Sequence, residues 1–76
     1  MANDYEKFQQ QIFDQIEELE QACKQAEQKE TLRPLLTQFI EDGQRCGINV
    51  MREVDRGGSI LDLVERVYGK LKKQGA

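Results

Sequence analysis

The sequence predicts an all-α fold, a long antiparallel helical hairpin plus a shorter third helix in the manner of a three-helix bundle. Apolar residues recur every three or four positions along three segments, as they do on one face of a helix. Short breaks that contain Pro or Gly separate these segments. Apolar and polar residues alternate nowhere for long, and residues 48–54 are only a weak candidate for a strand. The 76 residues are expected to form a single domain.

The first helix is expected over residues 3–29. Its apolar residues trace one face of a helix, which Phe13 and Ala22 widen. A straight helix of this length would measure about 39 Å, too much for one short neighbour to cover. We therefore expect part of this face to remain open. The whole face is called the apolar stripe of the first helix, and it consists of Tyr5, Phe8, Ile12, Ile16, Leu19, Cys23 and Ala26.

The second helix is expected over residues 31–56, with Thr31 as its N-cap. Pro34 then falls in the first turn, where the missing N–H costs nothing. The segment 43–47 is ambiguous because it contains two glycines. We favour a continuous helix, since one face is kept throughout by Phe39, Gly43, Cys46, Val50 and Val54. The alternative is that the helix breaks at 43–47 and a new element begins at Ile48.

The third helix is expected over residues 60–73. Gly57 and Gly58 mark a clear break before it, and Ser59 is a suitable N-cap with Asp62 three residues later. Three lysines in the last turn complement the helix dipole. Its expected apolar face consists of Ile60, Leu61, Val64, Val67, Tyr68 and Leu71.

The residue types argue against catalysis and against a bound metal or cofactor. The chain contains no His, the commonest general base and a usual zinc ligand. Its only serine, Ser59, is expected to be a cap, and the Gly57–Ser59 turn lacks the remaining residues of a P-loop. Cys23 and Cys46 would lie about 13 Å apart along the hairpin, so we expect two buried thiols rather than a disulfide. We expect no enzyme, no cofactor and no small-molecule substrate.

Charge divides the chain into two unlike halves. Residues 1–42 contain four basic and ten acidic residues, whereas residues 43–76 contain seven basic and four acidic ones. The plainest interpretation is mutual attraction between the halves of an antiparallel fold. A second is a nucleic-acid surface, although the overall pI of about 4.9 is low for one. Its residues would be Arg45, Arg52, Arg56, Lys70, Lys72 and Lys73. A third is an acidic decoy or inhibitor that uses the acidic face of the first helix.

The leading hypothesis is a non-catalytic protein–protein interaction module: an adaptor, an inhibitor or a regulatory subunit. The open part of the apolar stripe would bind another protein or a second copy of the chain, giving a dimer. With no membrane span or targeting segment in the sequence, a cytoplasmic location is expected. The residues expected at the interface are Tyr5, Phe8, Ile12 and Phe13, with Val54 and Leu61 nearby.

Overall fold

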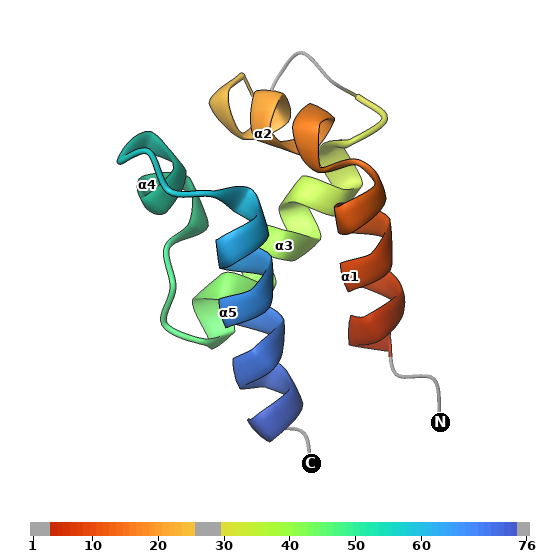
Figure 1. Cartoon of the computed structure of the whole chain (residues 1–76), viewed down its shortest axis with the longest axis vertical. Helices are drawn as coiled ribbons and strands as arrows, with labels where there is room; N and C mark the ends of the chain where they lie inside the picture. Colours follow the sequence, from red (N-terminus) through yellow and green to blue (C-terminus); the bar gives the residue numbers. More distant parts are fainter. Residues whose placement is uncertain (1–3, 26–29, 75–76) are drawn as a thin grey trace.

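The computed structural model describes residues 4–25 and 30–74, and within them the side chains of residues 6–25 and 30–73. Most of this part of the chain is helical, and it contains no strand. The all-α prediction is therefore confirmed, and the expected helical positions 3 and 26–29 lie outside the described residues. The five helices are α1 (Asp4–Asp14), α2 (Ile16–Lys24), α3 (Arg33–Arg45), α4 (Val50–Asp55) and α5 (Ile60–Gln74) (Figure 1).

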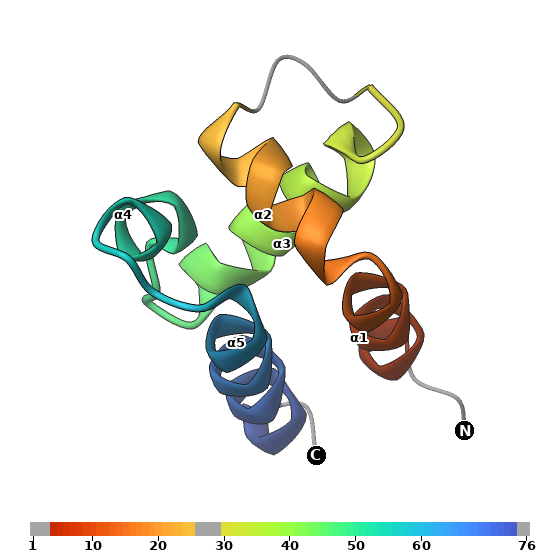
Figure 2. The same ribbon diagram turned by 45° about the horizontal axis from the view of Figure 1, so that its top comes forward.

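The helices form a compact globule rather than the expected hairpin with a third helix. The first and last helices, α1 and α5, pack against each other with opposite directions (Figures 1 and 2). An ion pair of 3.3 Å between Lys72 Nζ and Glu6 Oε1 joins their ends. The other helices pack together around the same core: α2 contacts α3, α4 and α5, and both α3 and α4 contact α5. The radius of gyration is 11.6 Å, close to the roughly 11.4 Å expected of a compact chain of this length.

The first predicted helix is interrupted at Gln15, so that α1 and α2 point in different directions. Gln15 has φ −123° and ψ 26°, outside the helical region. A straight helix of about 39 Å would exceed the longest dimension of the molecule, 35 Å. The bend instead lets both halves face one core, and Ile12 in α1 and Leu19 in α2 are fully buried. Most of the described apolar stripe is consequently covered within the chain.

The second predicted helix is also interrupted, between α3 and α4, so the expected continuous helix is wrong. A break occurs as in the alternative, but α3 continues to Arg45 and the next helix begins at Val50 rather than at Ile48. Gly47 has φ +76°, which favours glycine. Its N–H donates to the Gln44 carbonyl at 3.0 Å, and the Ile48 N–H donates to the Gly43 carbonyl at 2.8 Å. This pair of bonds is a Schellman motif, which ends α3. Gly43 remains inside α3, so the two glycines have different roles.

The starts of the later helices agree in part with the sequence prediction. Pro34 lies in the first turn of α3 as expected, but that helix begins at Arg33, so Leu32 rather than Thr31 is the N-cap. The Asn49 side chain caps α4 by accepting a hydrogen bond of 3.1 Å from the Arg52 N–H. A second Schellman motif ends α4 at Gly57, which has φ +90°. The predicted break at this point is confirmed.

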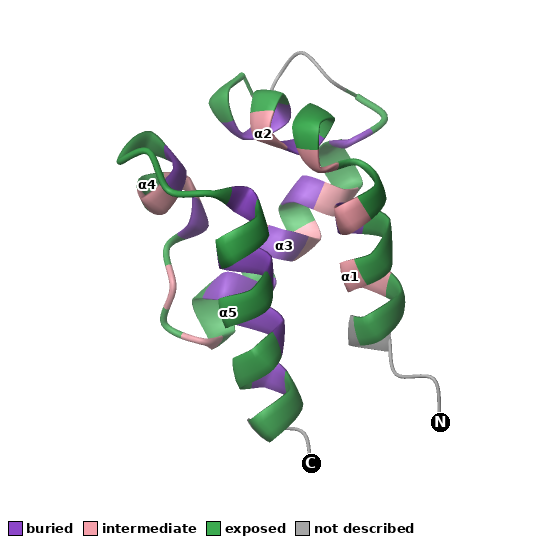
Figure 3. Cartoon of the chain, viewed as in Figure 1, coloured by how far each residue is buried: buried purple, intermediate pink, exposed green. Residues whose placement is uncertain are grey.

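The core is one cluster to which all five helices contribute (Figure 3). On α5 the inward face includes Leu63, which the sequence prediction left out, whereas Leu61 is 44% exposed. Leu61 is the one large apolar side chain that is exposed in the described part of the chain. Of the helices described, none is long and apolar enough to cross a membrane. The buried apolar residues are Ile12, Leu19, Ala22, Cys23, Leu32, Leu36, Phe39, Val50, Val54, Ile60, Leu63, Val64, Val67, Tyr68 and Leu71.

Candidate protein-interaction site

A hollow of about 580 Å³ opens where α1 bends into α2 and the segment before α3 passes beside the bend. Two parts of the chain that are distant in sequence form its wall, residues 13–18 and residues 31–32. We call this feature the bend hollow. Its described lining consists of Phe13, Asp14, Gln15, Ile16, Glu17, Glu18, Thr31 and Leu32.

The apolar part of the bend hollow comes from three side chains. Phe13 and Ile16 are half-buried and pack against the core, while Leu32 is buried. Phe13 and Ile16 lie three positions apart on either side of the interruption at Gln15, so the bend between α1 and α2 places them at the same hollow. An apolar group from outside the chain would therefore meet a surface that is already anchored in the core.

The polar part of the bend hollow is acidic. Asp14, Glu17 and Glu18 are exposed, and none of them forms an ion pair within the described residues. Asp14 accepts a hydrogen bond of 3.2 Å from the Gln10 side chain. Glu17 and Glu18 lie in the first turn of α2, where negative charge is favoured by the helix dipole. The described lining contains no Lys or Arg, so no described neighbour in the lining neutralises this negative charge.

The structure separates the six residues that the sequence assigned to a partner interface. Ile12 and Val54 are 0% and 4% exposed, so they belong to the core and offer no surface to a partner. Phe8 is half-buried against the core on α1. Phe13 lines the bend hollow, Leu61 is exposed on α5, and the side chain of Tyr5 lies outside the described residues.

A second, smaller hollow of about 490 Å³ lies at the start of α3, where Arg33, Pro34 and Thr37 line it together with Glu30 and Gln38. It has Pro34 as its apolar group and carries both signs of charge. This combination gives a partner no single sign of charge to match. The described charges of the bend hollow are all negative, so it is the better candidate on that count.

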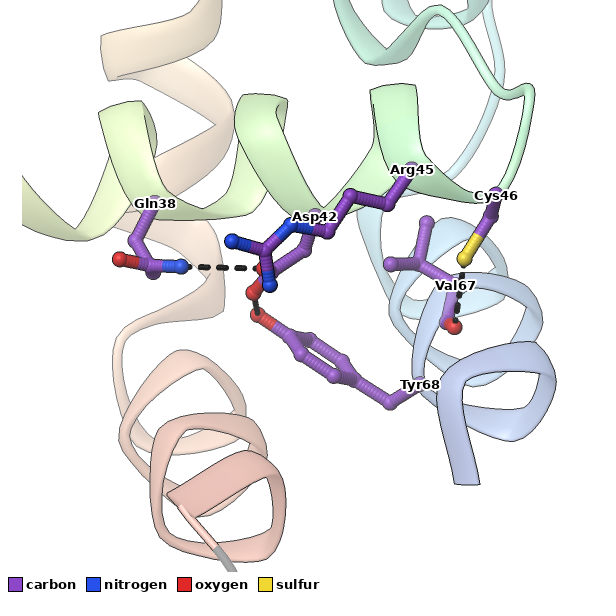
Figure 4. Close-up of polar contacts among 6 residues, drawn as sticks. All are labelled: Gln38, Asp42, Arg45, Cys46, Val67 and Tyr68. Atoms are coloured by element: carbon purple, nitrogen blue, oxygen red, sulfur yellow. Dashed lines mark hydrogen bonds and ion pairs between the residues drawn. The ribbon is translucent and has the colours of Figure 1, made fainter. Parts of the chain in front are cut away.

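A buried polar cluster joins α3 to α5. Asp42 is 1% exposed, and its carboxylate accepts hydrogen bonds from the Tyr68 hydroxyl at 3.2 Å and the Gln38 amide at 3.0 Å (Figure 4). Arg45 Nη1 lies 3.8 Å from the same carboxylate. The Tyr68 ring also stacks on Phe39, with ring centroids 6.1 Å apart. No buried side-chain nitrogen or oxygen in the described part of the chain lacks a partner, so the cluster is closed and acts as a structural crosslink.

Both cysteines are free thiols. Cys23 is buried on α2, and this burial, together with nearby Glu20, raises its pKa to about 11. Cys46 is half-buried after α3 and its thiol donates to the Val67 carbonyl at 3.3 Å (Figure 4). Burial also raises the pKa of Cys46, against an opposing effect of Lys70. A protonated thiol is a poor nucleophile and metal ligand, and no cluster of metal-binding side chains occurs in the described residues.

The six basic residues of the nucleic-acid alternative are distributed over α3, α4 and α5. Two of them, Arg52 and Arg56, lie on α4 or just after it. The others lie at the end of α3 or in the last part of α5: Arg45, Lys70, Lys72 and Lys73. The ion pair of 3.7 Å between Arg66 and Glu53 places α4 beside the middle of α5, about 10 Å along that helix from its last turn. Lys72 and Arg45 are further engaged with Glu6 and Asp42.

Sequence reasoning missed the bend hollow and the Asp42 cluster. A signal for Asp42 exists, because it follows Phe39 by three positions and so falls on the buried side of its helix. Phe13 lies beside the apolar stripe rather than on it, and this position was the one sequence signal for an apolar contact on another side of the first helix. Nothing in the spacing indicates that residues 31–32 lie against residues 13–18.

The chain matches no protein-family model, and neither the curated proteins nor the solved structures contain a detectable match to it.

Proposed function

We propose that this chain is a non-catalytic protein–protein interaction module, and that its partner binds in the bend hollow. The observation that carries the proposal is a hollow that combines core-anchored Phe13 and Ile16 with three acidic side chains that form no ion pair within the described residues. Protein–protein interfaces have an apolar centre and a polar rim, and the residues that contribute most to binding fill pockets near that centre. Of the six residues first assigned to the interface, Phe13 is retained as the anchor.

The residue chemistry supports a binding role over catalysis. The buried carboxylate of Asp42 is enclosed by hydrogen-bond donors, and the described thiols are protonated near neutral pH. A cytoplasmic location is part of the proposal, and the two free cysteines support it because disulfides persist mainly in oxidising compartments.

Position-specific photo-crosslinking tests the proposal. A photoreactive amino acid replaces Gln15, an exposed residue of the hollow, and the matched control replaces Gln44, an exposed residue of α3 outside it. In the cells that produce the protein, we expect a discrete adduct with another protein from position 15 and none from position 44. An adduct of about twice 8.8 kDa would identify a second copy as the partner. Equal labelling from both positions, or none from either, would contradict the proposed site.

Nucleic-acid binding is the second candidate, and it is weaker. The exposed basic residues that favour it, such as Lys70 and Lys73 on α5, are separated from Arg52 and Arg56 on α4. A gel-shift experiment at low salt with duplex DNA and with single-stranded RNA tests it. Binding through phosphates would weaken steeply as salt is added, and the absence of a shift at low salt removes this candidate.

A further inference from the structure

The bend hollow has a chemical preference that narrows the class of partner. Its acidic side chains, Asp14, Glu17 and Glu18, lie in one short stretch around the bend, and the described lining offers them no cation. Some carboxylates elsewhere in the chain have a cation beside them, as Glu6 has Lys72, and Glu53 and Asp62 have Arg66. Electrostatic complementarity between two surfaces favours the correct partner and accelerates its association.

The same hollow also requires an apolar group from its occupant. Phe13 and Ile16 retain exposed surface beside the carboxylates, and Leu32 closes the apolar part from the other segment. A volume of about 580 Å³ is of the size of small-molecule pockets, about 300–1,000 Å³, so it has room for side chains from a docked segment. A purely polar cation would leave this apolar surface uncovered.

We propose, on the basis of the proposed function, that the occupant of the bend hollow is a Lys- or Arg-rich amphipathic segment of another protein. One apolar side chain of that segment packs against Phe13 and Ile16, and its cations face Asp14, Glu17 and Glu18. A second copy of the chain fits less well. Among the described side chains, no exposed large apolar one lies beside the exposed lysines at the end of α5, since Leu61 is at the opposite end of that helix.

The test uses designed peptides of about 18 residues, or five helical turns. The basic peptide contains Leu and Lys in an amphipathic helical pattern, and its acidic twin has Glu in place of every Lys. Binding to the full-length protein is followed by fluorescence anisotropy and by amide chemical shifts. We expect the basic peptide to bind, with shifts centred on residues 13–18 and 31–32, and the acidic twin not to bind.

Charge reversal at the hollow provides the matched comparison. The double variant Glu17→Lys/Glu18→Lys should weaken binding of the basic peptide at least about tenfold, because two attractions become repulsions. The control Glu41→Lys/Glu65→Lys makes the same change in net charge at exposed positions outside the hollow, and it should bind like the unmodified protein. Circular dichroism establishes that both variants are folded. If the first is not, Glu17→Gln/Glu18→Gln replaces it, with a smaller loss expected.

Three results would overturn this inference: equal binding of the two peptides, equal weakening by the two double variants, or chemical shifts centred away from the hollow. The outcome is distinguishable from that of the crosslinking experiment. A protein adduct from position 15 without binding of the basic peptide would leave the proposed function standing and refute the basic segment. Binding of the peptide without any adduct in cells would support the chemistry of the hollow and refute the proposed function.

Discussion

Replacing Gly43 with Ala tests the close packing of α3 against the turn that follows it. Gly43 is buried inside α3, and a Cβ atom added there would lie 2.6 Å from Val50 Cγ2 and 2.9 Å from the Ile48 carbonyl oxygen. Neither neighbour is easily displaced. Val50 is β-branched and buried, and the Ile48 N–H is held by its hydrogen bond to the Gly43 carbonyl. The substitution therefore forces a shift of the turn or of α4.

Two opposing contributions decide the sign of the effect. Ala in place of Gly inside a helix stabilises by about 1 kcal/mol. Adding atoms to a well-packed core costs about 1–3 kcal/mol, and the two short contacts place Gly43→Ala in the upper part of that range. We expect a net loss of about 1–2 kcal/mol in the free energy of unfolding. At about 4–8 °C per kcal/mol for a domain of this size, the loss is readily measured.

Gly69→Ala is the matched control, because Gly69 lies in the interior of α5 with no atom within 4 Å of the added Cβ. It should stabilise the protein by about 0.5–1 kcal/mol. Thermal and urea unfolding, both followed by circular dichroism, measure the two variants side by side. The expected signs are opposite. If Gly43→Ala stabilised the protein as much as Gly69→Ala, α3 would not approach the turn as closely as the structure shows.

Three further predictions concern buried polar groups. Tyr68→Phe removes a hydroxyl that donates to the buried Asp42 carboxylate, and urea unfolding should show a loss of about 1.5–3 kcal/mol; no loss would argue against the buried hydrogen bond. Cys23 has its pKa raised from 9.0 to about 11, so the unfolded chain loses this proton first. Unfolding free energy should therefore fall by up to about 2–3 kcal/mol between pH 9 and 11, and Cys23→Ala should flatten that slope. Finally, a thiol reagent at pH 8 should label half-buried Cys46 before buried Cys23; the reverse order would contradict their burial.

The helix boundaries from α3 onward could be predicted in part from the sequence, because the breaks there are caused by local residues. Two consecutive glycines end α4, and Gly57 adopts the left-handed backbone conformation that such a break requires. Pro34 marks the first turn of α3. The choice between Gly43 and Gly47 was harder, because both fall within a helical apolar pattern. Only Gly47 has a positive φ, and Gly43 serves close packing instead.

The bend at Gln15 has no local cause of this kind. Phe13, Asp14 and Ile16 have modest helix propensities, but neither Gly nor Pro is nearby. Ile12 and Leu19 are seven positions apart and would share one face of a straight helix as well, so the apolar pattern is the same with or without the bend. A sequence pattern reports which face of a helix is apolar, but not whether the helix must bend to bury that face. The bend hollow depends on this interruption, so the periodicity of apolar residues in the sequence could not predict it.

The bend also changes what kind of association the chain supports. A straight first helix would have left a long apolar stripe open, and its partner would have bound through a large apolar contact. The bent helices bury most of the described part of that stripe, and Leu61 is the one large apolar side chain left exposed in the described residues. What remains at the bend is a small apolar surface beside Asp14, Glu17 and Glu18. Exposed charges contribute little affinity each, are screened by salt, and mainly accelerate encounter. We therefore expect a transient, salt-sensitive complex rather than an obligate one.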